Sequence, residues 1–503
     1  MSQREPVKNL LALFSGLLIP LAFAPYSYGL LVLPALALFF YLLESCSARQ
    51  AFVRGWCFGL GLFGAGLYWV YISIHFYGHV GIFLSVAVTF AMAALLALYP
   101  AIFAWLVVRF KPVMPGLRLV LLMPAVWLLM EWTKGWLFTG FPWLTLGYTQ
   151  IDTALAMYAP IVGVYGLSLL LVMQAGVLTW VLVVGRRAVL MGGLIFALIW
   201  LPALLFDEVQ WTQALGEPIA VSLVQGNVDQ NDKWNPSLRG EFINQYLEMS
   251  LGHLDSDIIV WPETAIPAFY HQLESSVIAE LDRLGKNSGT SFLVGVPVLD
   301  QQRWDYFNAV VALGQGQGTY YKNHLVPFGE YLPLRQWLGT LLHFMDIEMG
   351  DFSRGGVSQP LIQAAGLPVS VSICYEAIFE TERLSDLPEA ALLVNVSNDA
   401  WFADSSAPHQ HLEMVRMRAL EAGRWVLRAT NTGITAIIDE RGRVVARAPQ
   451  FEVYVLDGQL QPRSGATPFV IWGNIPVLVL VGLILLGCAT SPLFRLFGMK
   501  KVR

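Results

Sequence analysis

Long apolar runs at the two ends of the chain alternate with short polar breaks. Seven such runs fill the first 206 residues, and an eighth lies near the C-terminus. A helix needs about 20 mainly apolar residues to cross a bilayer, so each run predicts a membrane span. The predicted spans are 9–25, 27–44, 56–78, 81–108, 119–136, 160–184, 188–206 and 470–492.

The middle of the chain has a different pattern, in which shorter apolar runs alternate with amphipathic stretches. Runs rich in Val and Ile predict strands, and apolar residues spaced three or four apart predict helices. Strands that alternate with helices indicate a layered α/β domain. The predicted strands are 219–225, 257–261, 291–297, 308–314, 369–374, 391–397, 434–439 and 443–447, and the predicted helices are 238–250, 275–286 and 411–424.

These patterns divide the chain into three parts. Residues 1–210 are predicted to form seven transmembrane helices and residues 211–467 a soluble α/β domain, and residues 468–503 are predicted to hold the eighth transmembrane helix and a tail. The chain is 56% hydrophobic and only 13% charged, whereas soluble domains carry roughly 25% charged residues. A wholly soluble protein is therefore excluded, and a helical membrane bundle joined to an α/β domain is expected.

Charge is distributed unevenly over the three parts. Residues 1–206 carry 10 Lys or Arg and 4 Asp or Glu, residues 207–469 carry 17 and 32, and residues 470–503 carry 4 and none. Nucleic-acid binding requires clustered Lys and Arg that contact phosphates. The acidic middle domain is therefore not expected to bind nucleic acid.

The position of Lys and Arg predicts how the spans are oriented. Basic residues precede the first predicted span, follow the eighth, and occupy every second loop, whereas the loops 25–27, 79–81 and 137–159 contain none. Since basic loops favour the cytoplasmic side, both termini are expected in the cytoplasm and the middle domain outside it. A cleaved signal peptide ending at Ala22-Phe23-Ala24 is the alternative, but the Pro25 that follows favours a retained first span. The basic residues counted are Arg4, Lys8, Arg49, Arg54, Arg109, Lys111, Arg118, Arg186, Arg187, Arg495, Lys500, Lys501 and Arg503.

Two segments of the middle domain allow more than one interpretation. Residues 334–345 are rich in apolar side chains without a regular period, which fits either a lipid-facing arm or a buried loop. Gly314-Gln315-Gly316-Gln317-Gly318 joins two predicted strands and therefore indicates a hairpin turn rather than a phosphate-binding loop. The histidines give no metal-binding signal. His409 and His411 stand two apart on an expected loop that enters a helix. This is not a metal-ligand spacing, so no metal or other cofactor is expected.

Three polar residues stand out by their placement as candidates for chemistry: Glu263 and Cys374 at the ends of predicted strands, and Lys322 after Thr319-Tyr320-Tyr321. Cys374 is the only cysteine of the middle domain and has no local disulfide partner. A thiol must lose its proton to attack an acyl carbon, a carboxylate such as Glu263 can take that proton, and a lysine such as Lys322 can stabilise the oxyanion that forms. By placement alone, a packed cysteine, a solvated glutamate and a surface lysine remain the alternatives.

The residues around these three candidates form longer motifs. Trp261-Pro262-Glu263, Tyr321-Lys322-Asn323-His324-Leu325-Val326-Pro327-Phe328-Gly329-Glu330-Tyr331, Ile373-Cys374-Tyr375-Glu376 and the segment Val394-Asn395-Val396-Ser397-Asn398-Asp399-Ala400-Trp401-Phe402 resemble the nitrilase superfamily. Together with the eight predicted spans, they make the whole chain resemble the apolipoprotein N-acyltransferases, the membrane-embedded branch of that superfamily.

The resemblance implies a fold, a reaction and a location. It implies a four-layer αββα sandwich on the periplasmic side of the bacterial inner membrane. It implies that Cys374 takes an acyl chain from the sn-1 position of a phospholipid, phosphatidylethanolamine being the expected donor, as a thioester. The chain then passes to the α-amino group of the S-diacylglyceryl cysteine that begins an apolipoprotein, with Glu263 as general base and Lys322 as oxyanion stabiliser. No cofactor is required, and a monomer is expected.

Further residues receive roles by the same resemblance. Glu330, Tyr375 and Glu376 match supporting residues, and Trp234 and Trp401 match tryptophans that bind substrate on loops.

Two other functions compete with this interpretation. A membrane-tethered amidase of the nitrilase type would use the same three residues but transfer the acyl group to water, and it would not need eight spans. A transporter or receptor would need charged residues lining a path through the membrane, and only Glu131 and Lys134 come close to that requirement.

Overall fold

The computed structural model describes residues 4–110, 114–205, 209–332 and 352–490 of the 503-residue chain. Two compact units are present. One consists of Met1–Tyr71, Gly81–Val209 and Ile471–Arg503, and the other of Ile72–Val80 and Gln210–Val470. The apolar segment 334–345 lies outside the described residues.

The first unit is helical, and its side chains are apolar on the outside as well as the inside. Phe83, Leu190 and Leu483 are 93%, 86% and 61% exposed. Apolar surface of this extent is unfavourable in water and is typical of a surface that faces lipid. Its main helices are α1 (Arg4–Leu18), α2 (Val32–Leu42), α3 (Ala48–Gly66), α5 (Ile82–Leu96), α6 (Leu98–Arg109), α8 (Met123–Lys134), α9 (Ala159–Val184), α10 (Arg186–Leu205) and α17 (Ile475–Thr490).

Several of these helices are long and apolar enough to cross a bilayer. Within the described ranges, five segments meet that condition: Glu5–Ala22, Ile82–Arg109, Pro115–Lys134, Ala154–Val184 and Arg186–Leu205. A sixth results if Ala48–Gly66 and Trp69–Tyr77, which are bent by 51°, count as one span. Gly29–Leu42 and Ile475–Ala489 are shorter apolar helices. Each predicted span thus has an apolar helical counterpart, and the count of eight stays a prediction.

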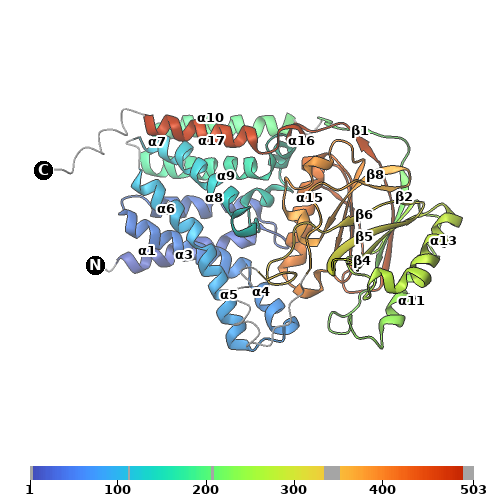
Figure 1. The fold of residues 1–503 in the computed structure, drawn as a ribbon. Helices are drawn as coiled ribbons and strands as arrows, with labels where there is room; N and C mark the ends of the chain where they lie inside the picture. Colours follow the sequence, from blue (N-terminus) through green and yellow to red (C-terminus); the bar gives the residue numbers. More distant parts are fainter. Residues whose placement is uncertain (1–3, 111–113, 206–208, 333–351, 491–503) are drawn as a thin grey trace. The chain divides into compact units, whose positions relative to one another are not determined.

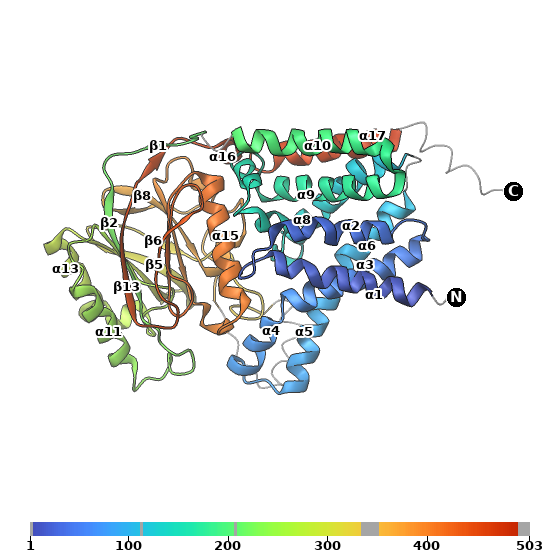
Figure 2. The same cartoon turned by 180° about the vertical axis from the view of Figure 1, so that it is seen from behind.

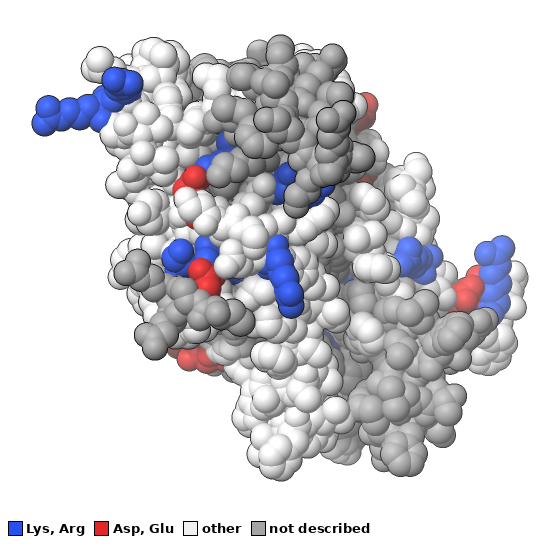
Figure 3. All heavy atoms as spheres, turned by 90° about the vertical axis from the view of Figure 1, so that its left-hand side faces the viewer, with Lys and Arg blue, Asp and Glu red and all other residues white. Residues whose placement is uncertain are grey.

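The helix ends that carry or adjoin Arg4, Arg49, Arg109 and Arg186 lie at one end of the helix bundle. The N-terminal ends of α1, α3 and α10 and the C-terminal end of α6 lie at the same end of the bundle in both views (Figures 1 and 2). Figure 3 shows the face on the left of Figure 1, where Lys and Arg side chains (blue) are scattered among mostly uncharged residues. The loops that carry the basic residues therefore share one side of the bundle.

The two charged residues near the end of α8 are buried and hold the chain that follows. Lys134 Nζ donates a hydrogen bond to the carbonyl of Trp143 at 2.5 Å, and Glu131 Oε1 accepts one from the backbone N–H of Leu146 at 3.0 Å. Both side chains are almost fully buried. They fix the connection between α8 and α9 rather than line a path.

The second unit contains two six-stranded mixed sheets. One has the order β12-β11-β10-β9-β8-β7 and the other the order β13-β2-β3-β4-β5-β6. The strands β8, β9 and β10 run parallel, as do β2, β3 and β4, and the outer strands are antiparallel. The strands are β2 (Ile219–Gln225), β3 (Ile258–Val260), β4 (Ser291–Asp300), β5 (Asp305–Gly314), β6 (Thr319–Tyr321), β7 (Ile362–Ala364), β8 (Leu367–Ile373), β9 (Leu392–Ser397), β10 (Val426–Thr430), β11 (Ala436–Ile438), β12 (Val444–Arg447) and β13 (Tyr454–Leu460).

The two sheets pack face to face, and helices cover their outer faces. Val221 and Ile258 of one sheet share a buried core with Val371 and Val394 of the other. The helices α11 (Arg239–Leu251) and α13 (Ala279–Ser288) pack on the outer face of the β2–β6 sheet, and α15 (Ser406–Ala422) packs on the outer face of the other. Figures 1 and 2 show these helices on opposite sides of the strands. The predicted αββα layering is confirmed.

The strand and helix predictions hold for most of the second unit. All eight predicted strands and the three predicted helices have counterparts, and the glycine-rich segment after β5 is the predicted hairpin turn to antiparallel β6. The short strands β6 and β7 and the strands β10 and β13 were not predicted. The expected loop around His409 and His411 was wrong, because α15 already begins at Ser406.

Candidate active site

The three candidate residues each follow directly on a strand. Glu263 comes after β3, Lys322 after β6, and Cys374 after β8. The chain of strand pairings from β3 through β4 and β5 to β6 makes β3 and β6 run in the same direction. Their C-terminal ends therefore lie at the same edge of one sheet, which brings Glu263 and Lys322 together.

Lys322 is buried between two carboxylates. Its Nζ lies 2.8 Å from Glu330 Oε1 and 3.2 Å from Glu263 Oε1. The lysine side chain is 1% exposed and the Glu263 side chain 8%. An ammonium group has three hydrogens to donate, so these two bonds leave one hydrogen for a further partner.

Two asparagines and a glycine complete the surroundings of Glu263. Asn308 Nδ2, from β5, donates to Glu263 Oε1 at 2.7 Å and to Glu330 Oε1 at 3.2 Å. The backbone N–H of Asn398 donates to Glu263 Oε2 at 2.8 Å. Gly295 lies beneath this turn, where a Cβ atom would come within 2.1 Å of the Pro262 carbonyl. Both carboxylate oxygens of Glu263 are therefore held in place.

Cys374 is a free thiol in a strained backbone position. Its φ angle of 53° lies in the left-handed region, which non-glycine residues seldom adopt. Burial and the neighbouring carboxylate of Glu263 raise the pKa of the thiol, whereas Lys322 and a hydrogen bond with Ser397 act against that rise. The resting form is therefore the thiol, and a base must take its proton when the sulfur attacks.

The pKa of Lys322 shifts in the opposite direction to what burial alone would cause. Burial by itself would lower the pKa of this ammonium group, but the carboxylates of Glu263 and Glu330 outweigh it and raise the pKa well above its ordinary value. Lys322 therefore keeps its charge, as a group that stabilises a developing negative charge must.

Glu376 and Tyr375 hold the polypeptide on either side of the candidate site. Glu376 Oε2 accepts a hydrogen bond from the N–H of Ile373 at 2.7 Å, and its Oε1 accepts bonds from the N–H of Asn323 at 2.7 Å and the hydroxyl of Tyr320 at 2.8 Å. The Tyr375 ring packs edge-on against Phe379, with 5.1 Å between ring centroids. Glu376 thus ties the segment after Lys322 to the strand end before Cys374.

The two tryptophans expected to bind substrate are exposed. Trp234 is 51% exposed, and the adjacent Lys233 is buried with its Nζ 3.4 Å from the Glu263 carbonyl oxygen. Trp401 is 41% exposed and contacts Tyr77 edge-on, with 6.1 Å between ring centroids. Both tryptophans therefore present apolar surface while their loops are anchored.

An open hollow is lined by a residue that is hydrogen-bonded to a neighbour of Glu263. It measures about 360 Å³ and its lining includes Tyr77, Asp229, Gln230 and Asp404. Gln230 Oε1 accepts a hydrogen bond at 2.7 Å from the side chain of Asn398, whose backbone N–H reaches Glu263. Gln230 and Asn398 therefore connect the hollow to the candidate base, Glu263, through hydrogen bonds.

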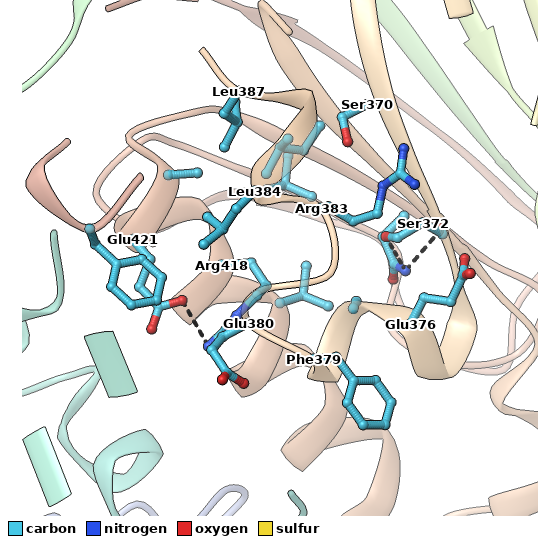
Figure 4. A pocket seen from close by; sticks show the side chains of 17 residues that line it. Ser370, Ser372, Glu376, Phe379, Glu380, Arg383, Leu384, Leu387, Arg418 and Glu421 are labelled. Carbon is cyan, nitrogen blue, oxygen red and sulfur yellow. Dashed lines mark hydrogen bonds and ion pairs between the residues drawn. The ribbon is translucent and has the colours of Figure 1, made fainter. Parts of the chain in front are cut away.

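A second, smaller cavity lies on the outer side of β8, beneath α15 (Figure 4). It measures about 50 Å³, and its lining includes Ser370, Ser372, Glu376 and Arg418 but none of the three candidate residues. Within the described part of the chain, no three His, Cys, Asp or Glu side chains gather as ligands of a metal ion.

Sequence reasoning missed several residues that the fold brings to this site. They are Asn308, Lys233, Ser397, Asp399, His411 and Arg428. Asn308 and Arg428 had a recognisable signal, because each interrupts an otherwise apolar strand and a polar group in such a place needs a buried partner. Ser397 and Asp399 lie within the motif segment 394–402, which marked the region but not their contacts, and Lys233 and His411 had no such signal in the local sequence.

Comparison with known proteins gives a consistent result over nearly the whole chain. The family profile of the apolipoprotein N-acyltransferase N-terminal domain matches residues 15–177, and the carbon-nitrogen hydrolase profile matches residues 220–468. The apolipoprotein N-acyltransferase of Methylococcus capsulatus is 48% identical over 93% of this chain and 93% of its own length. That of Pseudomonas syringae pv. tomato is 40% identical over 96% of each chain.

Among solved structures, Nit3 of Saccharomyces cerevisiae, a member of branch 10 of the nitrilase superfamily, matches 50% of this chain and 92% of its own. The TM-score is 0.37 and the sequence identity 18%. The assignment to a family rests on the sequence relatives, which span both units at high identity. The chain belongs to the apolipoprotein N-acyltransferase family.

Proposed function

We propose that the protein moves an acyl chain from the sn-1 position of a phospholipid, with phosphatidylethanolamine as donor, to the N-terminus of an apolipoprotein. Cys374 carries the chain as a thioester between the two steps. The acceptor is the α-amino group of an S-diacylglyceryl cysteine. One chain supplies all three catalytic residues, so we propose that the protein acts as a monomer.

In the first step, the sulfur of Cys374 attacks the ester carbonyl of the phospholipid. A carbon–sulfur bond forms while the thiol proton passes to Glu263, and Lys322 faces the oxyanion of the tetrahedral intermediate. The carbon–oxygen bond then breaks, and Glu263 returns the proton to the departing oxygen. A lysophospholipid leaves, and the acyl chain remains on Cys374.

In the second step, the amine of the acceptor attacks the thioester carbonyl. The amine loses a proton to Glu263 as the carbon–nitrogen bond forms, and Lys322 again faces the oxyanion. The carbon–sulfur bond breaks, and Cys374 regains its proton. A covalent intermediate lets two lipid-anchored substrates use one site in turn.

The observation that carries this proposal is the buried ion-pair network around Lys322. Two carboxylates hold one ammonium at 2.8 and 3.2 Å, next to a thiol whose pKa is raised by burial and by Glu263. A protonated thiol beside an ordered carboxylate and a permanent cation is the arrangement that base-assisted acyl transfer needs. The names of the relatives supply the substrate class.

Membrane placement follows from the basic loops. Because Lys and Arg favour the cytoplasmic side, the end of the bundle that carries Arg49, Arg109 and Arg186 is assigned to the cytoplasm, together with both termini. The catalytic unit, which follows an odd number of predicted spans, then lies on the periplasmic side of the inner membrane. Acyl donor and acceptor are both anchored in the membrane surface there.

Intact mass spectrometry of the purified protein after incubation with phosphatidylethanolamine tests this proposal. We expect a mass increase of one acyl chain that disappears on treatment with hydroxylamine, and no increase in Cys374→Ala. Cys46→Ala is the matched control and should acylate normally. Absence of the adduct in the unaltered protein would contradict the proposal, and release of free fatty acid without transfer to a diacylglyceryl peptide would indicate an amidase-like hydrolase instead.

A further inference from the structure

The backbone of Cys374 needs support from outside its own strand. A residue with a φ of 53° and a side chain is strained, and such strain persists only where surrounding groups hold it. Glu376 supplies one support, since its carboxylate binds the N–H of Ile373 just before the cysteine. A second support acts on the cysteine itself.

His411, from α15, provides that second support. Its Nε2 lies 3.1 Å from the carbonyl oxygen of Cys374, and its side chain is 1% exposed. A carbonyl oxygen can only accept a hydrogen bond, so Nε2 carries the proton in this contact. On its other side, Nδ1 lies 3.0 Å from Asp399 Oδ1. Burial and the charge of Arg428 lower the pKa of His411, so the imidazole is neutral. With its proton on Nε2, it accepts a hydrogen bond at Nδ1 from Arg428 Nη2, 3.2 Å away. The imidazole therefore holds the backbone and is not placed to take the thiol proton.

Asp399 is the centre of this arrangement. Its Oδ2 accepts a hydrogen bond from Arg428 Nη2 at 2.6 Å, and its Oδ1 accepts one from the Ser397 hydroxyl at 2.8 Å. Arg428 also approaches His411 Nδ1, at 3.2 Å. The four residues, here called the Asp399 cluster (Asp399, Ser397, His411 and Arg428), are all 1% exposed or less. Their buried charges are paired, as buried charges must be to be tolerated.

The Asp399 cluster reaches two different atoms of Cys374. Ser397 is a hydrogen-bond partner of the thiol, and His411 binds the carbonyl oxygen. Ser397 binds the Asp399 carboxylate directly, and His411 is linked to it through Arg428. The two residues come from separate elements, the end of β9 and the helix α15. The sulfur and the backbone carbonyl of Cys374 are therefore both positioned by residues that Asp399 connects.

We propose that the Asp399 cluster positions the nucleophile, with His411 as the positioning residue that fixes the strained backbone of Cys374. The inference rests on the proposed role of Cys374 as nucleophile. A correctly aimed sulfur reacts from a near-attack geometry, and a displacement of about 1 Å costs on the order of 10²-fold in rate. The Asp399 cluster therefore contributes to kcat and leaves substrate binding unchanged.

The two amide substitutions of His411 separate positioning from general packing. In His411→Gln, the longer side chain can place its amide N–H near the former Nε2 and donate to the Cys374 carbonyl. In His411→Asn, the shorter side chain reaches Asp399 but not that carbonyl. We expect the Gln variant to form the thioester within a fewfold of the normal rate and the Asn variant to be roughly 10- to 100-fold slower. KM for the phospholipid should stay unchanged in both.

The experiment measures single-turnover formation of the acyl adduct, KM, and Tm. His409→Asn, on the same helix and two residues away, is the matched control and should acylate at the normal rate. Equal rates in the Asn and Gln variants, whether both fast or both slow, would overturn the inference, as would a rise in KM instead of a fall in kcat. If the unaltered protein forms no adduct, the proposed function fails, and that result is distinct from the failure of positioning.

Discussion

Lys322 is held more closely by Glu330 than by Glu263. The Nζ–Oε1 distance is 2.8 Å to Glu330 and 3.2 Å to Glu263. Glu330 is also fixed through its second oxygen, which accepts the N–H of Val326 at 2.8 Å. Glu330 therefore anchors the cation, and Glu263 is left with the looser contact that a proton acceptor requires.

Glu330→Gln should weaken catalysis without abolishing it. The amide oxygen can still accept a hydrogen bond from Lys322, but the bond loses one of its two charges, which is worth about 1 kcal/mol, or a five- to tenfold loss of kcat/KM. Steady-state acyl transfer measures this effect. Glu274→Gln, at an acidic position of the second unit that takes no part in the site, should leave the rate unchanged. A loss as large as that of removing Lys322 would instead assign Glu330 to the chemistry.

Glu263→Gln should have two opposite effects on Cys374. Thioester formation should stop, because no base remains to take the thiol proton. The pKa of Cys374 should fall, because the carboxylate of Glu263 is one of the groups that raise it. More thiolate is then present at a given pH between about 8 and 10, so alkylation by uncharged iodoacetamide should be faster than in the unaltered protein.

The pH profile of alkylation, followed by mass spectrometry, provides the measurement. The unaltered protein should reach half-maximal reactivity at Cys374 only above the ordinary thiol range of about 8.5, and the curve of the Gln variant should be displaced to lower pH. A normal adduct yield in Glu263→Gln would remove Glu263 from the role of base. An unchanged alkylation profile would show that its charge does not act on the thiol.

Lys322→Met should reduce acyl transfer by about 10²–10³, the loss that follows removal of one oxyanion donor. The substitution also leaves Glu263 and Glu330 facing each other without a cation, so Tm should fall. Lys286→Met is the matched control, because Lys286 forms an exposed pair with Asp282 at 2.6 Å and such pairs contribute little. Near-normal transfer by Lys322→Met would exclude the oxyanion role.

Trp401→Ala should weaken phospholipid binding more than turnover. An exposed indole beside the site offers apolar contact to an acyl chain, and losing about 1.4 kcal/mol of that contact raises KM about tenfold. Trp304→Ala, at a 69% exposed tryptophan in the turn between β4 and β5, should leave KM unchanged. Transfer assays over a range of phosphatidylethanolamine concentrations separate KM from kcat, and equal KM values for both variants would remove Trp401 from the binding surface.

The local pattern of apolar and polar residues was sufficient to predict most strands and helices of the second unit. The strands around 219–225, 291–297 and 391–397 and the helix around 238–250 have counterparts in the structure, because their apolar residues repeat with the period of the element they form. The strands β10 and β13 were missed. In β10 the charged Arg428 interrupts the apolar run. In β13 most residues are polar or exposed. Neither segment therefore has the hydrophobic pattern by which a strand is predicted from sequence.

The positions of Glu263 and Cys374 after strands were visible in the sequence, whereas the short strand β6 before Lys322 was not, and the flanking motifs singled out all three residues. The hydrogen-bond partners of these residues were not visible in the sequence. Asn308, Asp399 and His411 belong to elements far apart along the chain, and each is recognised only by the atom that lies opposite it in the fold. A hydrogen bond between residues far apart in the chain produces no periodic pattern in the local sequence, so it cannot be predicted from that pattern.

The sequence by itself determined which segments are apolar helices, where most of the strands lie, and where a thiol and a carboxylate follow a strand, since these depend on neighbouring residues and on hydropathy. Only the tertiary structure decided that Lys322 is shared between two carboxylates, that Cys374 adopts a left-handed backbone conformation, and that Asp399 lies beside His411 and Ser397, which both contact Cys374. The physical reason is that charge pairing and strain depend on distances across the sandwich, which are set by how two sheets and a covering helix pack.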